Sequence, residues 1–509
     1  MTASHGVTLG KGDTTLAEIA AIADGAPLAL AADALAAMDH VQGLIQQAIA
    51  QGRVIYGLTT GVGDLVTSRL DAADVAAVQL HMLKSHACGV GAPLAPREVR
   101  AMMAVMIKSL LQGYSGVSPA LVTVMAQMLN RGVIPWSPAK GSVGYLIATA
   151  HIGLAVFGYG QCWYQGQLLP SDEALAQAGI ACCQPGPREG HALVSGTYEI
   201  TALGCLALVD FAALVPLADA AGAMSLEALK GNTRGYDARL QALRPHAGQR
   251  ATADLLRRLL TDSEILDRYR DYRVQDALSL RCIPQIHGAV RDQLAFCQHV
   301  VHTELNAVTD NPVFLVEEGE LVVLPGGNGH GAPIALSLDA LAIAIAVLST
   351  ASQARSDRLT NGHLSGLPAF LLEGAGGHSG LMIPPYAAAA LAGENRSLAA
   401  PASVHTVTTC AGQEDHISQG VNAARKALDA VANAVDIVAI ELLCAAQALD
   451  FHRSLRPSRG ARAMLAAIRS QVPCLTQDRE LWRDLAALRQ LMTGGVLLQS
   501  LQPLLEERE

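Results

Sequence analysis

Long apolar stretches that recur from about residue 201 onward constrain the fold of this chain most. Between Lys426 and Ile440 the apolar residues fall at spacings of three and four, which is the pattern of an amphipathic helix. Similar stretches cover residues 201–229, 254–272, 334–354 and 423–449, with short polar joints between them. Long helices joined in this way favour an up-and-down bundle. We therefore expect residues 201–509 to form a long helical bundle that ends in a charged helical cap.

The first 200 residues have a different character. Glycine-rich segments, YGLTTGVG at 56–63 and SHACGVG at 85–91, interrupt Ala-rich helical runs. Glycines in such segments indicate turns that need a positive φ. We expect residues 1–200 to form a smaller, loop-rich domain. The only convincing strand alternation is short, as in residues 313–323, where a hairpin would turn at Glu318-Gly319.

Composition narrows the class of protein. Hydrophobic residues make up 51% of the chain and aromatic residues only 4%, so its apolar content is mainly Ala, Leu and Val. Ala and Leu are strong helix formers, which favours a mostly α protein. The net charge of −9 argues against a nucleic-acid binder, which would show a basic stripe.

The sequence also bears on location. Asp210, Asp219 and Asp339 interrupt the longest apolar stretches, so buried bundle helices are a better interpretation than membrane spans. The N-terminal residues lack the apolar core of a signal peptide. The ten cysteines show no metal-ligand spacing. These features predict a cytoplasmic protein with reduced thiols, no membrane partner and no metal site.

Short segments rich in chemically useful residues follow one another between residues 55 and 451. Besides the two glycine-rich segments, they are KGSVGYLIATAH at 140–151, GHALVSGT at 190–197, QDALSLRC at 275–282, GGNGHG at 326–331 and QEDH at 413–416. In order and spacing they resemble the aromatic amino-acid ammonia-lyases and related aminomutases, most closely the histidine branch. The resemblance implies a mostly α fold of the fumarase/aspartase-type superfamily, with an elongated central bundle. It also implies a homotetramer whose active sites combine residues from several subunits.

The resemblance further implies a reaction, the non-oxidative elimination of ammonia from an aromatic or imidazole L-amino acid. A histidine-like substrate would give a urocanate-like acrylate. In the family, an Ala-Ser-Gly tripeptide after GSVG cyclises into methylidene-imidazolone, the electrophile that attacks the substrate. In this sequence Gly144 is followed at once by Tyr145. The flank of the cofactor remains, as Gly141, Ser142 and Gly144, but the tripeptide is not in the sequence.

Two explanations of this gap are open. In the first, the cyclised tripeptide is a single non-standard residue that the written sequence leaves out, and the cut at both of its edges favours this. In the second, the deletion is genuine, and the continuous numbering from Met1 to Glu509 agrees with it. Several nearby departures from the family pattern also support a genuine deletion; they are Tyr145 for Asp, Ala148 for Pro, Ser195 for Asn, Leu278 for Tyr and Gly329 for Phe.

By resemblance, Tyr56 is the catalytic base that takes the β-proton of the substrate. Gly144 and Tyr145 border the electrophile, and Ser195 takes the place of the Asn that polarises it. A serine offers only one hydrogen-bond donor and a shorter reach. Leu278 stands where the family has a second catalytic Tyr, and it cannot transfer a proton.

Other residues would bind the substrate. Arg281 would clamp the α-carboxylate, because a planar guanidinium donates two parallel hydrogen bonds. His86 and Glu414 would read an imidazole or another polar side chain, with Asn328 and Gln413 beside the substrate. Each residue also has an ordinary structural explanation, such as a hydrogen-bonded histidine or a surface ion pair.

Two functions follow from these observations. In the first, the protein is a carbon–nitrogen lyase that uses methylidene-imidazolone made from the tripeptide. In the second, it has no such cofactor and binds an aryl-carboxylate ligand or a partner, or runs a different cofactor-free reaction. An unassisted α-amino group is a poor leaving group, so the retained Tyr56 and Arg281 alone would not lower the barrier enough for deamination.

Overall fold

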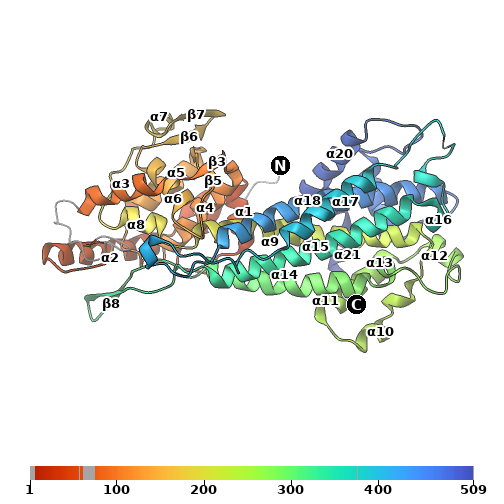
Figure 1. Cartoon of the computed structure of the whole chain (residues 1–509), viewed down its shortest axis with the longest axis horizontal. Coiled ribbons are helices and arrows are strands. Elements are labelled where there is room, and N and C mark those ends of the chain that lie inside the picture. The colour runs from red at the N-terminus through yellow and green to blue at the C-terminus, as the bar shows by residue number, and fades with distance from the viewer. Residues whose placement is uncertain (1–5, 57, 61–74, 375, 508–509) are drawn as a thin grey trace. The chain divides into compact units, whose positions relative to one another are not determined.

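The computed structural model describes residues 6–56, 58–60, 75–374 and 376–507 of the chain. These residues are mostly helical, and their strands form only small sheets of two or three strands (Figure 1). The long apolar stretches are helices, as the sequence predicted. They are α9 (Tyr198–Ala228), α14 (Ile283–Leu305), α15 (Ala332–Thr360) and α18 (Gly420–Leu449). The mostly α fold class is confirmed.

One predicted helix is wrong in extent. The stretch 254–272 is not continuous but divides into α11 (Ala247–Leu259) and the short α12 (Glu264–Arg268). Asp262 between them has a φ of 62°, and the Ser263 side chain caps α12 by accepting from the Leu266 amide. A residue in the left-handed region followed by an N-cap serine stops one helix and starts another, whatever the apolar spacing.

The described residues divide into two compact units. Unit 1 comprises residues 1–209, 298–339 and 401–425, and unit 2 comprises residues 210–297, 340–400 and 426–509. The boundary falls inside the long helices α9, α14, α15 and α18. A division by contacts does not test where independently folding domains end, so the domain boundary near residue 200 stays a prediction.

Unit 1 combines helices with all of the described sheets. Its helices are α1 (Leu16–Ala23), α2 (Ala32–Ala50), α3 (Val75–His86), α4 (Pro96–Leu110), α5 (Pro119–Arg131), α6 (Ile147–Val156), α7 (Ser171–Gln177) and α8 (Glu189–Val194). Its strands are β1 (Val7–Leu9), β2 (Leu28–Leu30), β3 (Val90–Pro93), β4 (Ile134–Pro135), β5 (Pro138–Lys140), β6 (Gln161–Tyr164), β7 (Gln167–Pro170), β8 (Val313–Glu317) and β9 (Glu320–Leu324). Their sheets are β1–β2, β3–β5, β4–β6–β7 and β8–β9.

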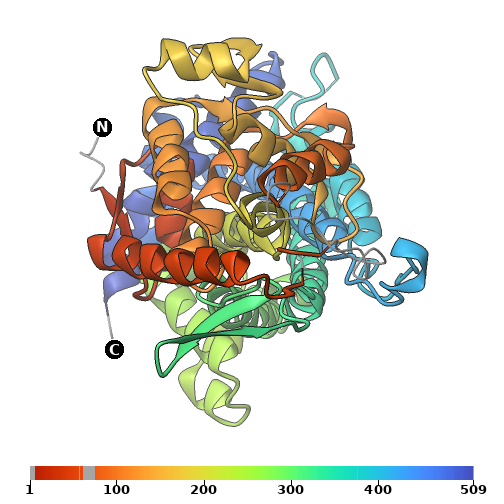
Figure 2. The ribbon, with the colours of Figure 1, turned by 90° about the vertical axis from the view of Figure 1, so that its left-hand side faces the viewer.

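The predicted hairpin is present as β8 and β9, with Glu317 paired to Glu320. Glu318 and Gly319 both have a positive φ, 51° and 86°, which is the geometry of a tight two-residue hairpin turn. Figure 2 shows this ribbon beside helix α2. Phe314 and Leu321 of the hairpin pack with Ile45 of α2 in one buried apolar cluster.

The described residues of unit 2 form helices and no strands. Four of these helices are shared with unit 1: unit 2 contains the C-terminal parts of α9, α15 and α18 and most of α14. Its shorter α-helices are α10 (Ala238–Ala242), α11, α12, α13 (Leu278–Arg281), α16 (Gly362–Ser365), α17 (Pro384–Leu398), α19 (Arg459–Arg469), α20 (Leu481–Thr493) and α21 (Val496–Glu506). Short 3-10 turns are η2 (Thr233–Tyr236), η3 (Ala369–Leu371) and η5 (Asp450–His452). Helices α19 to α21 lie in the C-terminal region that the sequence predicted to be a helical cap, and that role stays a prediction.

Among the described residues, two helical segments are long and apolar enough to cross a membrane, 189–228 and 332–360. In each, 72% of the apolar window is buried inside the protein. Burial of that extent is typical of the core helices of a large bundle, which pass the same test of length and composition.

A network of charged side chains is buried in unit 2. Arg355 donates from Nε to Glu441 Oε1 at 2.5 Å and from Nη2 to Glu441 Oε2 at 2.9 Å, and both side chains are fully buried. Ser225 Oγ donates to the same carboxylate at 2.7 Å. Close by, the carboxylate of Asp219 contacts His287 Nδ1 at 2.6 Å and also pairs with Arg291. Each arginine of this network is paired with a carboxylate, so the stability of each buried charge depends on its partner.

We predict that Glu441→Ala lowers the free energy of unfolding by about 3–5 kcal/mol, because it leaves the Arg355 guanidinium buried without a counter-charge. Urea denaturation measures the loss. The matched control on the same helix is Asp436→Ala, which breaks the half-exposed pair with Arg489. That pair should contribute less than about 1 kcal/mol. Equal losses in the two variants would show that the buried network does not set the stability of the bundle.

Candidate active site

The segment that resembles the cofactor loop forms a turn between β5 and α6 in unit 1. Ser142 Oγ donates to the carbonyl of Tyr145 at 3.1 Å and accepts from the amide of Gly144 at 3.3 Å. At the end of the turn Leu146 has φ 84° and ψ −47°. This is close to the γ-turn with positive φ, which is rare and strained for a residue with a side chain. The turn is therefore tight and under local strain.

The glycines of this turn are required by their surroundings. A Cβ on Gly144 would lie 2.7 Å from Ser418 Oγ, and Gly141 has a φ of 118°. The close approach at Gly144 and the positive φ at Gly141 each favour glycine. The sequence passes directly from Gly144 to Tyr145, so the turn does not contain the tripeptide from which the family's group is made.

A second loop of unit 1 presents Glu414. The backbone of Thr409 pairs with that of Glu414, with the Thr409 amide donating to the Glu414 carbonyl at 2.9 Å. Cys410, Ala411 and Gly412 between them all have a positive φ, from 51° to 92°. Thr409 Oγ1 donates to Glu414 Oε2 at 2.7 Å. One carboxylate oxygen is therefore held by the loop itself.

The cofactor turn and this loop meet through Tyr145. The Tyr145 hydroxyl donates to Glu414 Oε1 at 3.2 Å. Burial, together with the nearby Glu414 carboxylate, raises the pKa of Tyr145 above its ordinary value. The phenol therefore stays protonated, and can donate to Glu414, throughout the neutral range. Two segments 269 residues apart in the sequence are joined at this point.

Tyr56, the predicted base, adds to the raised pKa of Tyr145. Its ring meets that of His191 edge to face, with centroids 6.0 Å apart. The Thr59 hydroxyl, which replaces the family's Asn, accepts from the Ile55 amide at 2.8 Å and donates to a carbonyl at 2.9 Å. This threonine therefore braces the turn that carries Tyr56. Residues 57 and 61–63 of the same segment lie outside the described residues.

His86 is the last residue of α3 and is half-buried. Its Nδ1 lies 2.8 Å from the carbonyl of Met82 and 3.0 Å from Ser85 Oγ. A carbonyl can only accept, so Nδ1 carries the proton and Nε2 is the acceptor nitrogen. The ring orientation is fixed by its own helix, which suits a residue that must present one nitrogen to a ligand.

The remaining predicted residues of unit 1 are less informative. Ser195 Oγ accepts from the Asn311 amide at 3.1 Å and donates to the Asn311 carbonyl at 3.3 Å, so its hydroxyl holds a backbone turn. Asn328 donates from Nδ2 to the Val308 carbonyl at 3.1 Å. Gln413 is exposed in the loop that presents Glu414. Their assigned roles stay predictions.

Arg281 belongs to unit 2, unlike the other predicted site residues. It ends α13 and lines a cavity of about 330 Å³ with Asp276, Gln285 and Cys282. Among the described residues, Arg281 Nε, Asp276 Oδ1 and Gln285 Oε1 are buried without a hydrogen-bond partner. These three polar atoms could bond to water or to a polar ligand in the cavity.

Two buried side chains fix the turn that carries Arg281 through hydrogen bonds to its backbone carbonyls. Tyr236 Oη donates to the Leu280 carbonyl at 2.7 Å, and Arg355 Nη1 donates to the Ser279 carbonyl at 3.3 Å. The ion network of unit 2 therefore also positions this arginine. Leu278, at the position of the family's second Tyr, is 61% exposed and offers no proton-transfer group.

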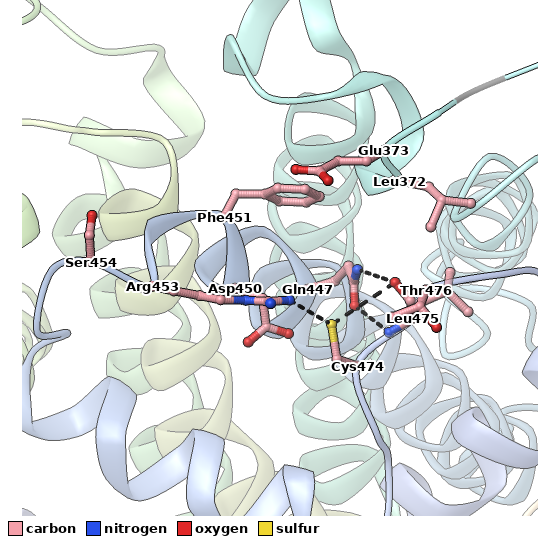
Figure 3. A pocket seen from close by; sticks show the side chains of 10 residues that line it. All are labelled: Leu372, Glu373, Gln447, Asp450, Phe451, Arg453, Ser454, Cys474, Leu475 and Thr476. Carbon is pink, nitrogen blue, oxygen red and sulfur yellow. Dashed lines mark hydrogen bonds between the residues drawn. The ribbon is translucent and has the colours of Figure 1, made fainter.

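A second cavity in unit 2, also of about 330 Å³, is lined by Gln447, Arg453 and Cys474 among others (Figure 3). Gln447 bridges its wall by donating to the carbonyls of Leu371 and Leu475, and Arg453 donates to Cys474 Sγ at 3.5 Å. Burial raises the pKa of the Cys474 thiol, so a thiolate nucleophile is disfavoured there. This cavity contains none of the predicted site residues.

Sequence reasoning missed three contacts around the site. Thr409 holds Glu414, His191 contacts Tyr56, and His330 pairs with His416 with ring centroids 5.3 Å apart. His191 was visible as a signal, because it replaces a leucine in the family's EGLAL segment. Thr409 lies in the same loop as Glu414. The contact of His330 with His416 depends on which loops meet in space, and no local pattern reports that.

Comparison with known proteins places these features in a family. A family model described as aromatic amino acid lyase matches residues 14–470. The chain is 46% identical over 500 residues to a histidine ammonia-lyase of Sorangium cellulosum, covering 96% of this chain and 97% of the relative. It is 40% identical to one of Caldanaerobacter subterraneus, covering 90% of each.

Solved structures agree with these relatives. The crystal structure of histidine ammonia-lyase from Trypanosoma cruzi matches with a TM-score of 0.92 and 34% identity, covering 99% of this chain and 96% of that one. A tyrosine aminomutase of Streptomyces globisporus matches with a TM-score of 0.93 and 32% identity, covering 99% and 100%. The resemblance of the sequence segments is thereby confirmed, and the chain belongs to the aromatic amino acid lyase family.

Proposed function

We propose that this protein is an ammonia-lyase that eliminates ammonia from an imidazole-bearing L-amino acid, histidine or a close analogue, to give a urocanate-like acrylate. The observation that carries the proposal is the 46% identity to a histidine ammonia-lyase over 96% of the chain. Relatives from several further bacteria, at 40–43% identity, carry the same name. The alternative, a scaffold that only binds a ligand or partner, is not favoured by these relatives.

The recognition groups suit an imidazole. The ring of the substrate offers one N–H donor and one acceptor nitrogen when neutral. Glu414 Oε1, which accepts from Tyr145, can accept from the substrate N–H instead or as well. His86, with its proton held on Nδ1, presents a second acceptor through Nε2, which suits the second N–H of a protonated imidazole. An aromatic hydrocarbon ring has no N–H group to offer to either acceptor, so it would gain neither hydrogen bond.

The chemistry needs a base and an electrophile. Tyr56 would take the β-proton, with its ring held by the edge-to-face contact with His191. Methylidene-imidazolone, when bound between Gly144 and Tyr145, supplies the electron-poor carbon that turns the α-amino group into a leaving group. We propose that the active chain carries this group there, made from an Ala-Ser-Gly tripeptide that the written sequence leaves out.

Arg281 would hold the substrate carboxylate, and the unsatisfied Asp276 and Gln285 atoms around it would help to orient the amino acid. We propose a homotetramer, in which unit 2 of one copy supplies this arginine to a site whose other residues belong to a second copy. We also propose a cytoplasmic location. The substrate would be a small molecule of the amino-acid or aryl-carboxylate class.

The first prediction combines an assay of ammonia release with a measurement of the intact mass of the protein. Incubation with L-histidine should release ammonia together with a new absorbance from the conjugated acrylate. The intact mass should exceed the 53.1 kDa of the sequence by that of a dehydrated Ala-Ser-Gly. Tyr56→Phe should lower kcat by about 10²–10⁴-fold, the usual contribution of a general base. A mass equal to that of the sequence, with no ammonia from histidine, tyrosine or phenylalanine, would refute the proposal.

The second concerns the carboxylate clamp. Arg281→Lys should weaken binding of the product acrylate, urocanate, roughly ten- to hundredfold in calorimetry, because lysine cannot donate two parallel hydrogen bonds. Arg234→Lys is the matched control: it lines the same cavity, but its pair with Asp271 is exposed. Its effect should stay within about threefold. Equal weakening in both variants would argue for a diffuse charge effect instead of a clamp.

A further inference from the structure

The side chain of His191 contacts the predicted base and stands where the family segment has a leucine. It belongs to α8 and is only 7% exposed. Its ring and that of Tyr56 meet edge to face, with centroids 6.0 Å apart and planes at 74°. Aromatic rings favour this arrangement because the positive edge of one ring faces the negative face of the other. A leucine would offer no directional contact of this kind.

The backbone around His191 leaves the imidazole little room to move. The His191 amide donates to Oε1 of the buried Gln79 on α3 at 2.9 Å. The His191 carbonyl accepts from the Ser195 amide at 2.9 Å. A Cβ on Gly190 would lie 2.2 Å from the carbonyl oxygen of Gln79, so α8 packs directly on the backbone of α3. This close approach requires a glycine beside His191.

The start of α8 is held by buried polar groups as well. Arg188, with a φ of 75°, donates to Asp310 at 2.6 Å, and neither side chain has exposed surface. Glu189 accepts from the amide and the hydroxyl of Ser118, at 3.0 and 2.5 Å. All six residues of the helix are buried. The imidazole of His191 is therefore carried by a part of unit 1 that is fixed on several sides.

Tyr56 has a less regular setting. It lies in a turn, outside any helix or strand, and its side chain is half-buried. A general base must come within hydrogen-bond reach of the proton that it removes. A displacement of about 1 Å at a reacting group can lower the rate about 10²-fold. A rigid neighbour that fixes the orientation of the phenol ring therefore has a direct effect on the rate.

We propose that His191 is a positioning residue for the base: its imidazole, carried by α8, holds the ring of Tyr56 in the orientation from which the phenol oxygen takes the β-proton. The inference rests on the proposed function for the reaction that it assists. The placement of the ring is a property of the folded chain and is tested without substrate. His191 neither touches the substrate nor transfers a proton in this role.

The variant His191→Leu tests the role in kinetics, and the family's own leucine at this place should let α8 fold. With L-histidine, kcat should fall about two- to tenfold, the usual effect of one edge-to-face contact, and KM should stay within about twofold. With L-histidine deuterated at Cβ, the isotope effect on kcat should be at least as large as in the wild type, because proton removal is the step that slows. A smaller isotope effect would place the loss in another step and overturn the proposal.

Two further variants separate the ring from the rest of the side chain. His191→Phe keeps an aromatic ring and should retain kcat within about twofold. His452→Leu is the matched control in unit 2, since His452 is also buried and meets Tyr269 with ring centroids 6.0 Å apart. Its ring also bonds to the Ala228 carbonyl at 3.0 Å, so the variant should lower Tm. It should leave kcat and the isotope effect unchanged.

Crystal structures of the wild type and of both His191 variants show the ring directly. The Tyr56 ring should occupy one position in the wild type and in His191→Phe. In His191→Leu it should shift or take two positions. Tm measured for every variant ensures that a loss of folded protein is not counted as a loss of rate.

The proposal is overturned if the Tyr56 ring keeps its wild-type position in His191→Leu, or if it moves without a fall in kcat. An equal fall of kcat in His191→Phe or in His452→Leu would also overturn it. A wild type that releases no ammonia refutes only the proposed function, and the position of the ring then decides the placement by itself. An active enzyme in which His191→Leu changes neither ring nor rate refutes only the positioning role.

Discussion

The hydrogen bond from Tyr145 to Glu414 is the contact on which the architecture of the site depends. It joins the short turn before α6 to a loop near the start of α18, and each partner is fixed independently. Ser142 and the surrounding glycines set the path of the turn, and Thr409 sets the carboxylate. Because both sides are held by their own bonds, the contact places a donor and an acceptor with little freedom of movement.

Buried polar groups, more than apolar ones, define the functional regions of both units. Interiors tolerate unpaired charges poorly, so each such group forces a specific arrangement of its neighbours. In unit 2 the pair of Arg355 and Glu441 supports the short helix of Arg281. In unit 1 the fully buried pair of Arg188 and Asp310 lies next to Asn311, whose backbone Ser195 binds. Arg281 and Ser195 are thus each connected to a buried ion pair through the backbone of a neighbouring residue.

Features with a local cause could be predicted from the sequence. Apolar residues at helical spacing gave the long helices, and Glu318-Gly319 gave the hairpin turn. The family segments named the residues that meet around Tyr145, since their order and types are retained. The continuous helix over 254–272 was wrong, because a left-handed Asp262 ends the helix in spite of its apolar spacing. The contact between His330 and His416 was missed, since it arises only when segments 86 residues apart meet.

The loop that presents Glu414 has one more consequence, which concerns the entropy of binding. A backbone pair at the base and the hydrogen bond from Thr409 Oγ1 to the carboxylate hold this segment at both ends. The loss of freedom therefore occurs when the chain folds, and a ligand that reaches the carboxylate orders almost nothing further. Selectivity at this position can then depend on fit and on matched donors, with hardly any contribution from loop adaptation.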